Sequence, residues 1–173
     1  MANSKEKPIF FETASVVAIQ ADIKTQTRRA FRPPEGPPGT ALKGWRPQYQ
    51  VGDILWVRET WGVGIQLSGG IIYKADYIGK KAPPLAEGHK WHPSMRMPRH
   101  MARIFLRVTD ARVERLQDIS ESDAVAEGLT DPTRYTPGEN IQRFAAFWDN
   151  FNVKRGYGWE TNPWVWAYTF ERV

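Results

Sequence analysis

Asp22-Ile-Lys-Thr-Gln-Thr-Arg-Arg29 brings a lysine, two threonines and two arginines together within eight residues, where a helical pattern ends. If this stretch is extended, successive side chains alternate between two faces. Lys24 then shares one face with Arg28, whereas Thr27 shares the other with Arg29. A bend between Lys24 and Thr27 would instead bring the amine beside the hydroxyl, as in a base–nucleophile pair or a phosphate clamp. A solvated basic strand start is the simpler interpretation.

Basic residues are concentrated toward the N-terminal side of the sequence. Residues 1–116 hold 19 Lys and Arg against 10 Asp and Glu, a net charge of +9, whereas residues 117–173 hold 5 against 9, a net charge of −4. Residues 24–32 alone carry four basic side chains and no acidic one. This asymmetry is typical of a protein whose basic side meets a polyanion or a phosphorylated ligand.

The length and composition predict one cytoplasmic domain over residues 1–173. A chain of 173 residues is long enough to bury a substantial core. The absence of cysteine excludes disulfides, a thiol nucleophile and a Cys-based zinc site. Residues 1–7, predicted to be a loose tail, have no apolar signal core, and no apolar run reaches the roughly 20 residues that a membrane span needs. We therefore expect no membrane partner.

The three histidines give little support for a metal site. His89, His92 and His100 lie within twelve residues, but Pro93 disfavours the helical turn that would align the first two. Within residues 79–98, Glu87 is the only carboxylate. Neither a Walker loop nor a dinucleotide fingerprint is present. We predict no metal and no cofactor.

Short apolar segments bounded by turn residues predict five to seven strands. The clearest candidates are residues 8–11, 54–59, 71–74, 103–108, 111–116 and 164–170. Thr109 and Asp110 predict a bulge or kink between the fourth and fifth of these. In the last segment every second residue is aromatic, so its aromatic face is expected to pack on the core or on a ligand.

Three helices are predicted. The first spans residues 13–22. In the second, Ser120 is expected to cap a helix that runs to Glu127 and stops at Gly128. The third carries apolar residues at helical spacing, which we assign to the core. These residues are Ile141, Phe144, Ala145, Trp148 and Phe151.

The order of these elements predicts an α+β fold, because the strands and helices do not alternate as a doubly wound sheet requires. The prediction is a small mixed β-barrel with about three peripheral helices. Residues 33–50 and 77–98 carry several prolines and are expected to form long loops. The sequence leaves open whether these loops cover the site.

Several segments match the pattern of one known family. The signature G-x-K-x-x-(E/T)-x-R is met at Lys24, Thr27 and Arg29, with Asp22 where the family usually has glycine. Aspartate tolerates the left-handed backbone of a helix end better than most residues. Further matches lie in residues 52–57, 116–128 and 163–170. Together they resemble the ASCH domain of the PUA-like β-barrel superfamily. With residues 56–61 and 91–99, the set looks like the ASCH proteins encoded by phages or prophages.

The resemblance implies binding of RNA or a modified base. Thr27 points to the branch that includes the small bacterial N4-acetylcytidine amidohydrolases. Carried over motif by motif, the catalytic residues are Lys24, Thr27 and Glu127. Thr27 would attack an N4-acyl carbonyl and Lys24 would take the hydroxyl proton. Glu127 would orient the base or pass the proton to the leaving amine.

The chemistry needs a lysine that loses its proton, and its neighbours act in opposite directions. The charges of Arg28 and Arg29 would help Lys24 to deprotonate, whereas Glu127 would oppose this. Without the resemblance, Thr27 is an ordinary strand threonine and Glu127 a surface carboxylate at a helix end.

Two further clusters are candidates for contacts with a ligand or a nucleic acid. Arg58 and Glu59 can bind a base edge or a phosphate, with Trp61 as a stacking face. An internal ion pair on a barrel rim is equally consistent. The second cluster, Trp91, Arg96 and Arg99, lies on a predicted loop, where ligand contacts are often found. Simple solvation of these side chains is the alternative to a binding role. The full predicted binding set is Arg28, Arg29, Arg58, Glu59, Trp61, Trp91, Arg96 and Arg99.

The sequence leaves three functions open for a protein whose partner is RNA or a nucleoside. Hydrolysis of an N4-acylcytidine amide requires Lys24 and Thr27 within hydrogen-bond reach. A ribonuclease acting on single-stranded RNA requires an open groove. An RNA-binding module requires only a basic surface and stacking aromatics. No obligate protein partner is inferred. The predicted cleft is lined by Lys24, Thr27, Arg29, Glu59 and Glu127.

Overall fold

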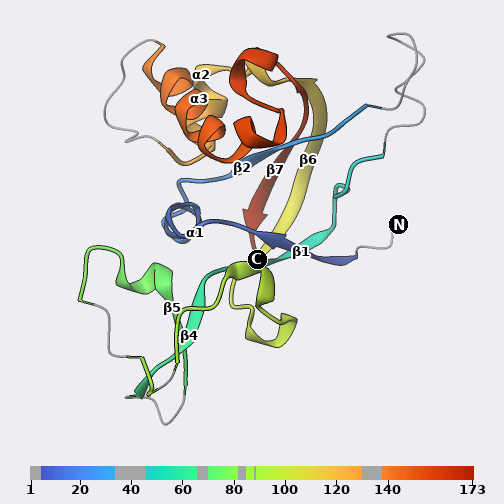
Figure 1. The fold of residues 1–173 in the computed structure, drawn as a ribbon. Coiled ribbons are helices and arrows are strands. Elements are labelled where there is room, and N and C mark those ends of the chain that lie inside the picture. The colour runs from blue at the N-terminus through green and yellow to red at the C-terminus, as the bar shows by residue number, and fades with distance from the viewer. Residues whose placement is uncertain (1–4, 34–45, 66–69, 82–84, 88, 130–137) are drawn as a thin grey trace.

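A five-stranded mixed sheet forms the centre of the protein (Figure 1). The computed structural model describes residues 5–33, 46–65, 70–81, 85–87, 89–129 and 138–173. The strands of the sheet are β1 (Glu6–Phe10), β2 (Gln26–Ala30), β3 (Ile54–Arg58), β6 (Phe105–Arg115) and β7 (Trp164–Arg172). A separate hairpin pairs β4 (Trp61–Val63) with β5 (Ile71–Tyr73).

The central sheet is open. Its order is β1-β3-β6-β7-β2, so that β1 and β2 form the two edges. β1 runs parallel to β3, and the other neighbours are antiparallel. No sheet closes on itself among the residues that the structure describes, so the predicted β-barrel is not confirmed.

The predicted kink at Thr109 and Asp110 is confirmed as a bulge within one strand. Val108 pairs with Phe170 and Asp110 pairs with Thr169, so Thr109 is the extra residue. A bulge bends a strand and increases its twist without ending the pairing. The two strands predicted over residues 103–108 and 111–116 are therefore a single strand, β6.

Within the described ranges, three α-helices accompany the sheet, which confirms the α+β class. They are α1 (Thr13–Gln20), α2 (Glu121–Ala126) and α3 (Glu139–Asn152). α2 begins as predicted, because the Ser120 hydroxyl accepts a hydrogen bond from the backbone N–H of Asp123 at 3.1 Å. α1 ends two residues earlier than predicted. In the described part of the chain, no helix has both the length and the apolar character needed to cross a membrane.

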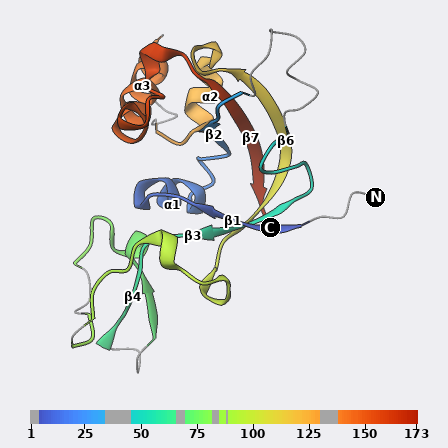
Figure 2. The same cartoon turned by 45° about the vertical axis from the view of Figure 1, so that its right-hand side comes forward.

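Two hydrophobic clusters hold the elements together. In the first, Val16 and Ile19 of α1 pack with Leu55 and Leu106 of the sheet. In the second, Ala124 of α2 and Phe144 of α3 pack with Val165 of β7. Figures 1 and 2 show α2 and α3 together beside β2 and β7, with α1 between them and the β4–β5 hairpin.

Two predictions about individual residues are wrong. Glu6 and Lys7 belong to β1 rather than to a loose tail, and the Lys7 amine pairs with Asp53 at 2.6 Å. Phe151 is 51% exposed, although its helical spacing assigned it to the core together with Phe144. The reason is that the buried stripe of α3 runs through Phe144, Trp148 and Asn152, so Phe151 lies beside this stripe on the adjacent face of the helix.

The two predicted loops are described in part. In residues 46–50, the Tyr49 side chain is only 3% exposed. Residues 94–96 form a short 3-10 turn within the second predicted loop, and another such turn follows it at residues 99–101. Residues 34–45, 82–84 and 88 lie outside the described residues.

Gly128 lets the end of α2 approach the segment before β2 closely, and we predict that Gly128→Ala destabilises the protein. Its φ is +81°, and an added Cβ would lie 2.6 Å from the Cβ of Lys24 and 3.0 Å from that of Ala18. A left-handed alanine costs about 1–2 kcal/mol. The overlap adds about 1–3 kcal/mol. Chemical denaturation measures the loss in the free energy of unfolding.

Gly156→Ala is the matched control for this variant. Gly156 has the same φ of +81°, but an added Cβ would meet nothing within 4 Å. This control is expected to lose only the backbone contribution. Equal losses in the two variants would show that the close approach at Gly128 does not matter for stability.

Candidate functional site

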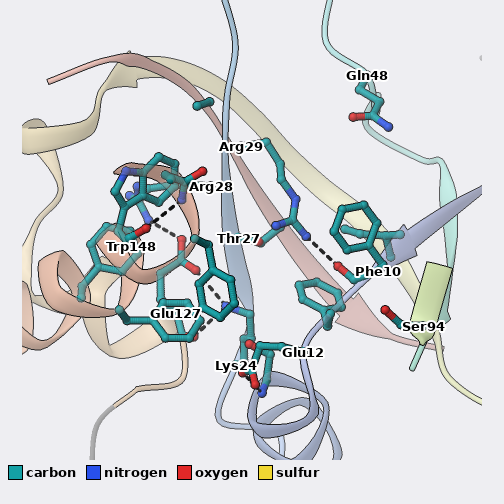
Figure 3. Close-up of a pocket in the computed structure, with 18 of the residues that line it drawn as sticks. Phe10, Glu12, Lys24, Thr27, Arg28, Arg29, Gln48, Ser94, Glu127 and Trp148 are labelled. Carbon is teal, nitrogen blue, oxygen red and sulfur yellow. Dashed lines mark hydrogen bonds and ion pairs between the residues drawn. The ribbon is translucent and has the colours of Figure 1, made fainter. Parts of the chain in front are cut away.

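A cavity of about 460 Å³ lies where the two hydrophobic clusters meet (Figure 3). Ile9 and Phe11 contribute one wall, and Phe144 and Trp148 of α3 contribute another. The segment that the sequence singled out, residues 22–29, contributes Lys24, Thr27, Arg28 and Arg29 to the polar part of the lining. The cavity therefore combines an apolar interior with a short row of chemically active side chains, as is typical of small-molecule sites.

The end of α1 positions Lys24. Asp22 adopts a left-handed φ of 56°, as the sequence suggested for this position. The N–H of Ile23 donates to the carbonyl of Ala18 at 2.9 Å, and the N–H of Asp22 donates to that of Ile19 at 3.1 Å. These are the two hydrogen bonds of a Schellman motif, which reverses the chain after a helix. Lys24 follows directly and is buried, with 3% exposure.

The amine of Lys24 is bound twice by one residue. Its Nζ donates to the backbone carbonyl of Glu127 at 2.7 Å and to the Glu127 carboxylate at 2.8 Å (Figure 3). The backbone N–H of Thr25 donates to the carbonyl of Ala126 at 2.8 Å, which fixes the end of α2 beside Lys24. Among the described residues the amine has no third hydrogen-bond partner.

Arg28 holds the other oxygen of the same carboxylate. Its Nη1 donates to Glu127 Oε1 at 3.1 Å, and its guanidinium also pairs with Glu114 and Asp123. Burial favours a raised pKa at Asp123, but the charge of Arg28 and its other partners outweigh burial and lower that pKa. The Arg28 side chain is fully buried, so it acts as the anchor of α2 rather than as a free cation.

Burial holds the pKa of the Lys24 amine below its ordinary value of 10.5. Glu127 opposes this shift by attraction and hydrogen bonding, and the charge of Arg29 reinforces it. An amine with a lowered pKa is more readily neutral and able to accept a proton. Between the lowered pKa and 10.5 the unfolded chain binds more protons than the folded one. The contribution of Lys24 to the free energy of unfolding therefore rises with pH in that window.

Thr27 lies in β2 opposite Tyr168 of β7 and lines the cavity. Its side chain is buried, with 3% exposure. No hydrogen-bond partner of its hydroxyl is found in the part of the chain that the structure describes. The cavity is thus lined by a buried amine and an unpartnered hydroxyl, and among the described residues no hydrogen bond joins the two.

Arg29 lies against the aromatic end of β1. Its Nη2 donates to the carbonyl of Phe10 at 3.0 Å, and its guanidinium lies 5.6 Å from the ring centroid of Phe10 and 5.2 Å from that of Phe11. Burial lowers the pKa of Arg29. Arg29 forms no ion pair with a carboxylate among the described residues, in contrast to Arg28.

Comparison with solved structures identifies the fold. An ASCH domain from Lactobacillus crispatus JV V101 matches with a TM-score of 0.50 and 13% sequence identity, over 97% of this chain and 79% of that chain. The chain has the ASCH-domain fold. A DUF984 protein from Enterococcus faecalis V583 matches with a TM-score of 0.49 and 12% identity, over 100% of this chain and 78% of that chain. No family model and no curated protein matches the sequence. Neither structural match supports the predicted phage or prophage type.

The ASCH fold brings part of the predicted site together. The predicted residues that line the common cavity are Lys24, Thr27, Arg28, Arg29 and Glu127. The predicted residues that do not line it are Arg58, Glu59, Trp61, Trp91, Arg96 and Arg99. The first group comes from two segments about 100 residues apart, which the backbone hydrogen bond between Thr25 and Ala126 joins.

Glu59 was expected in the cleft, but it belongs to a separate ion pair. It is 1% exposed and accepts hydrogen bonds from Arg103 at 2.8 and 2.9 Å. Arg99 likewise pairs with Glu6 at 2.8 Å and lies 4.6 Å from the centroid of the Phe105 ring. Both residues meet partners that are distant in sequence, so their local context does not identify them.

Of the remaining predicted residues, Arg58 ends β3, Trp61 begins β4, and Trp91 lies against Gly62 of β4. The Arg58 guanidinium lies 4.8 Å from the Trp56 ring centroid, and Trp61 stacks on His92 with centroids 4.4 Å apart. Arg58 Nε and Trp61 Nε1 are buried without a hydrogen-bond partner within the described ranges. Trp91 is half-buried; Arg96, the remaining residue of the predicted set, is exposed.

Sequence reasoning missed most of the aromatic lining. Phe10 is the last residue of β1, and Phe11 comes directly after it. Tyr49 comes from a predicted loop, and Phe147 and Phe151 come from α3. The α3 pair carries a signal that was available. Phe147 and Phe151 are four residues apart and therefore share a face of the helix. An aromatic pair displaced from the centre of the buried stripe indicates a second contact surface.

We predict that the pKa of Lys24 responds in opposite directions to its two charged neighbours. Arg29→Gln should raise this pKa because the repelling charge is removed, and Glu127→Gln should lower it further because an attracting charge is removed. An NMR titration of the Lys24 side chain measures both shifts. Arg96→Gln, at an exposed position outside the cavity, is the control. A wild-type pKa of about 10.4, the value for a free lysine, would contradict the buried amine.

Proposed function

We propose that this protein hydrolyses an amide on the exocyclic amine of a modified pyrimidine nucleoside, with N4-acylcytidine as the substrate class. One arrangement carries the proposal. A buried amine, held twice by Glu127, shares a cavity with the unpartnered hydroxyl of Thr27. The ASCH resemblance implies the same three residues, Lys24, Thr27 and Glu127, for the N4-acetylcytidine branch.

The hydrogen bonds of Lys24 favour its action as a base. A neutral amine has two N–H groups and one lone pair. The two hydrogen bonds to Glu127 use both N–H groups and leave the lone pair for an incoming proton. Arg28 binds the second oxygen of Glu127, which limits the ability of that carboxylate to keep the amine protonated.

The reaction then proceeds through an acyl–enzyme ester. Thr27 Oγ1 attacks the acyl carbon while its proton passes to Lys24 Nζ. The tetrahedral intermediate collapses, the C–N bond breaks, and Lys24 returns the proton to N4 of the leaving cytidine. Water then attacks the ester with the same amine as base, which releases the carboxylic acid and restores the Thr27 hydroxyl. Glu127 keeps the amine in position through both steps.

The aromatic lining supports a base as the ligand. Phe11, Phe147, Trp148 and Phe151 present rings to the cavity from two sides. Stacking of a base on an aromatic side chain contributes about 1–3 kcal/mol. The volume of about 460 Å³ lies within the range of pockets that hold drug-sized ligands.

Thr27→Ala is predicted to lower acetate release from N4-acetylcytidine by about 1,000-fold or more, because the nucleophile is lost. The affinity for the product cytidine should change by less than about threefold, since stacking and polar contacts remain. Chromatography of the released cytidine measures turnover, and calorimetry measures binding. Thr25→Ala is the matched control, on the same segment but outside the cavity lining. Turnover retained by the Thr27 variant would eliminate Thr27 as the nucleophile.

Single-stranded RNA binding or cleavage is a second candidate. It is favoured by the buried, unpartnered donors Arg58 Nε and Trp61 Nε1 beside the stacked rings of Trp61 and His92. A buried donor without an acceptor costs about 1–3 kcal/mol, which a base or phosphate oxygen would recover. A ribonuclease would in addition use Lys24 or Arg29 at the scissile phosphate. A binding module would need neither.

If this second function operates, Arg58→Gln should weaken the binding of a short single-stranded RNA by about tenfold, the loss expected for one charge-assisted hydrogen bond. The affinity of the wild type should also fall steeply with salt. Fluorescence anisotropy measures both effects. Arg107→Gln is the control, because Arg107 is exposed and already paired with Glu171. Equal weakening by the two variants would indicate general attraction rather than a site at Arg58.

A further inference from the structure

Among the described residues, four basic side chains line the cavity, and they differ in whether they form an ion pair with a carboxylate. Lys24 and Arg28 are both paired with Glu127. Arg29 and Arg155 line the same cavity. Neither of them is in an ion pair within the described part of the chain. Two positive charges therefore face one cavity without a carboxylate in direct contact, although the more distant charge of Glu127 also attracts Arg29.

The hydrogen bonds of these two arginines leave most of their donors available. Arg29 donates one hydrogen bond to the carbonyl of Phe10 at 3.0 Å. Arg155 donates one to the amide oxygen of Asn152 at 3.5 Å. A guanidinium carries five N–H donors, so each retains several.

The remaining carboxylate in the cavity lining does not balance them either. Glu12 accepts hydrogen bonds from the backbone N–H groups of Ala14 at 3.0 Å and Ser15 at 2.7 Å. It caps the N-terminus of α1, and its negative charge is used by that helix end. The charge around Arg29 and Arg155 is therefore left for a ligand.

The two arginines are close enough to affect each other. Burial lowers the pKa of Arg29, and repulsion from Arg155 contributes to the same shift. Like charges that face a common cavity favour an anion between them. Guanidinium groups bind phosphate in a bidentate manner, and two of them can share one phosphate group.

We propose that the ligand carries a phosphate on its ribose and that Arg29 and Arg155 bind this phosphate at the mouth of the cavity. The substrate would then be a nucleotide or an RNA nucleotide rather than a free nucleoside. This inference rests on the proposed function for the identity of the base, but the phosphate site itself does not require hydrolysis.

The depth of the residues agrees with the shape of such a ligand. Lys24 and Thr27 are buried, whereas Arg155 is exposed at the end of the turn that follows α3. In a cytidine nucleotide, N4 and the 5′-phosphate lie at opposite ends of the molecule. When N4 reaches the buried pair, the ribose and phosphate point toward the opening, where Arg155 lies.

Calorimetry with cytidine and cytidine 5′-monophosphate as probes, at one ionic strength, tests this proposal. The wild type should bind the monophosphate about tenfold more tightly than cytidine, as expected for a charge-assisted hydrogen bond. Arg155→Gln should remove most of this difference and leave the affinity for cytidine unchanged. Lys154→Gln is the matched control, because Lys154 is an exposed neighbour that does not line the cavity. Equal affinities of the wild type for the two probes would overturn the proposal. So would an equal loss of affinity for the monophosphate in Arg155→Gln and Lys154→Gln.

A second measurement separates this proposal from the proposed reaction. Inorganic phosphate is titrated while the Nε–Hε NMR signals of Arg29 and Arg155 are followed. In the wild type, both signals should shift together as phosphate is added. In Arg155→Gln, the Arg29 signal should no longer shift. This result would support the phosphate site even if N4-acetylcytidine is not hydrolysed. If neither signal responds and the monophosphate does not bind, the site is refuted, whatever the outcome of the hydrolysis assay. The dinucleotide cytidylyl-cytidine, compared with the monophosphate, distinguishes an RNA phosphodiester from a terminal phosphate.

Discussion

The carboxylate of Glu127 is the contact on which the rest of the site depends. One of its oxygens meets Lys24 and the other meets Arg28, so the end of α2 is tied to the segment that joins α1 to β2. This contact spans the two hydrophobic clusters, whose junction is the cavity. Loss of Glu127 would leave the buried Arg28 guanidinium and the buried Lys24 amine without their shared partner, and breaking a buried pair costs about 3–5 kcal/mol. The backbone hydrogen bond from Thr25 to Ala126 supports the same junction.

The same contact links stability to chemistry. Two apolar side chains of similar volume would often stabilise the fold as well as a buried ion pair does. Stability alone therefore does not account for a lysine at this position. A buried Lys24, with its pKa lowered and both hydrogen bonds directed at Glu127, has a specific chemical capacity, which is to accept a proton inside the cavity. Packing and reactivity are thus produced by one arrangement.

Local features of the fold could be predicted from the sequence because they depend on neighbouring residues. The Ser120 cap, the left-handed Asp22 and the bulge at Thr109 follow from side-chain chemistry within a few positions. Closure of the sheet could not be predicted, since it depends on how far the edge strands approach in space. The same limit applies to the site. Glu59 is predicted in the cleft from its local sequence, but both of its carboxylate oxygens accept hydrogen bonds from Arg103, 44 residues away.

The charge asymmetry of the sequence has a different meaning once the fold is known. An excess of basic residues before position 117 and of acidic residues after it suggests a surface for polyanions. Part of that asymmetry is neutralised inside the protein by ion pairs between its basic and acidic parts. Lys24 pairs with Glu127, and Arg28 pairs with both Glu127 and Asp123. Net charge therefore locates no ligand by itself. The informative cations are those for which the fold supplies no carboxylate, and a cavity lined by such cations is where the remaining positive potential can act.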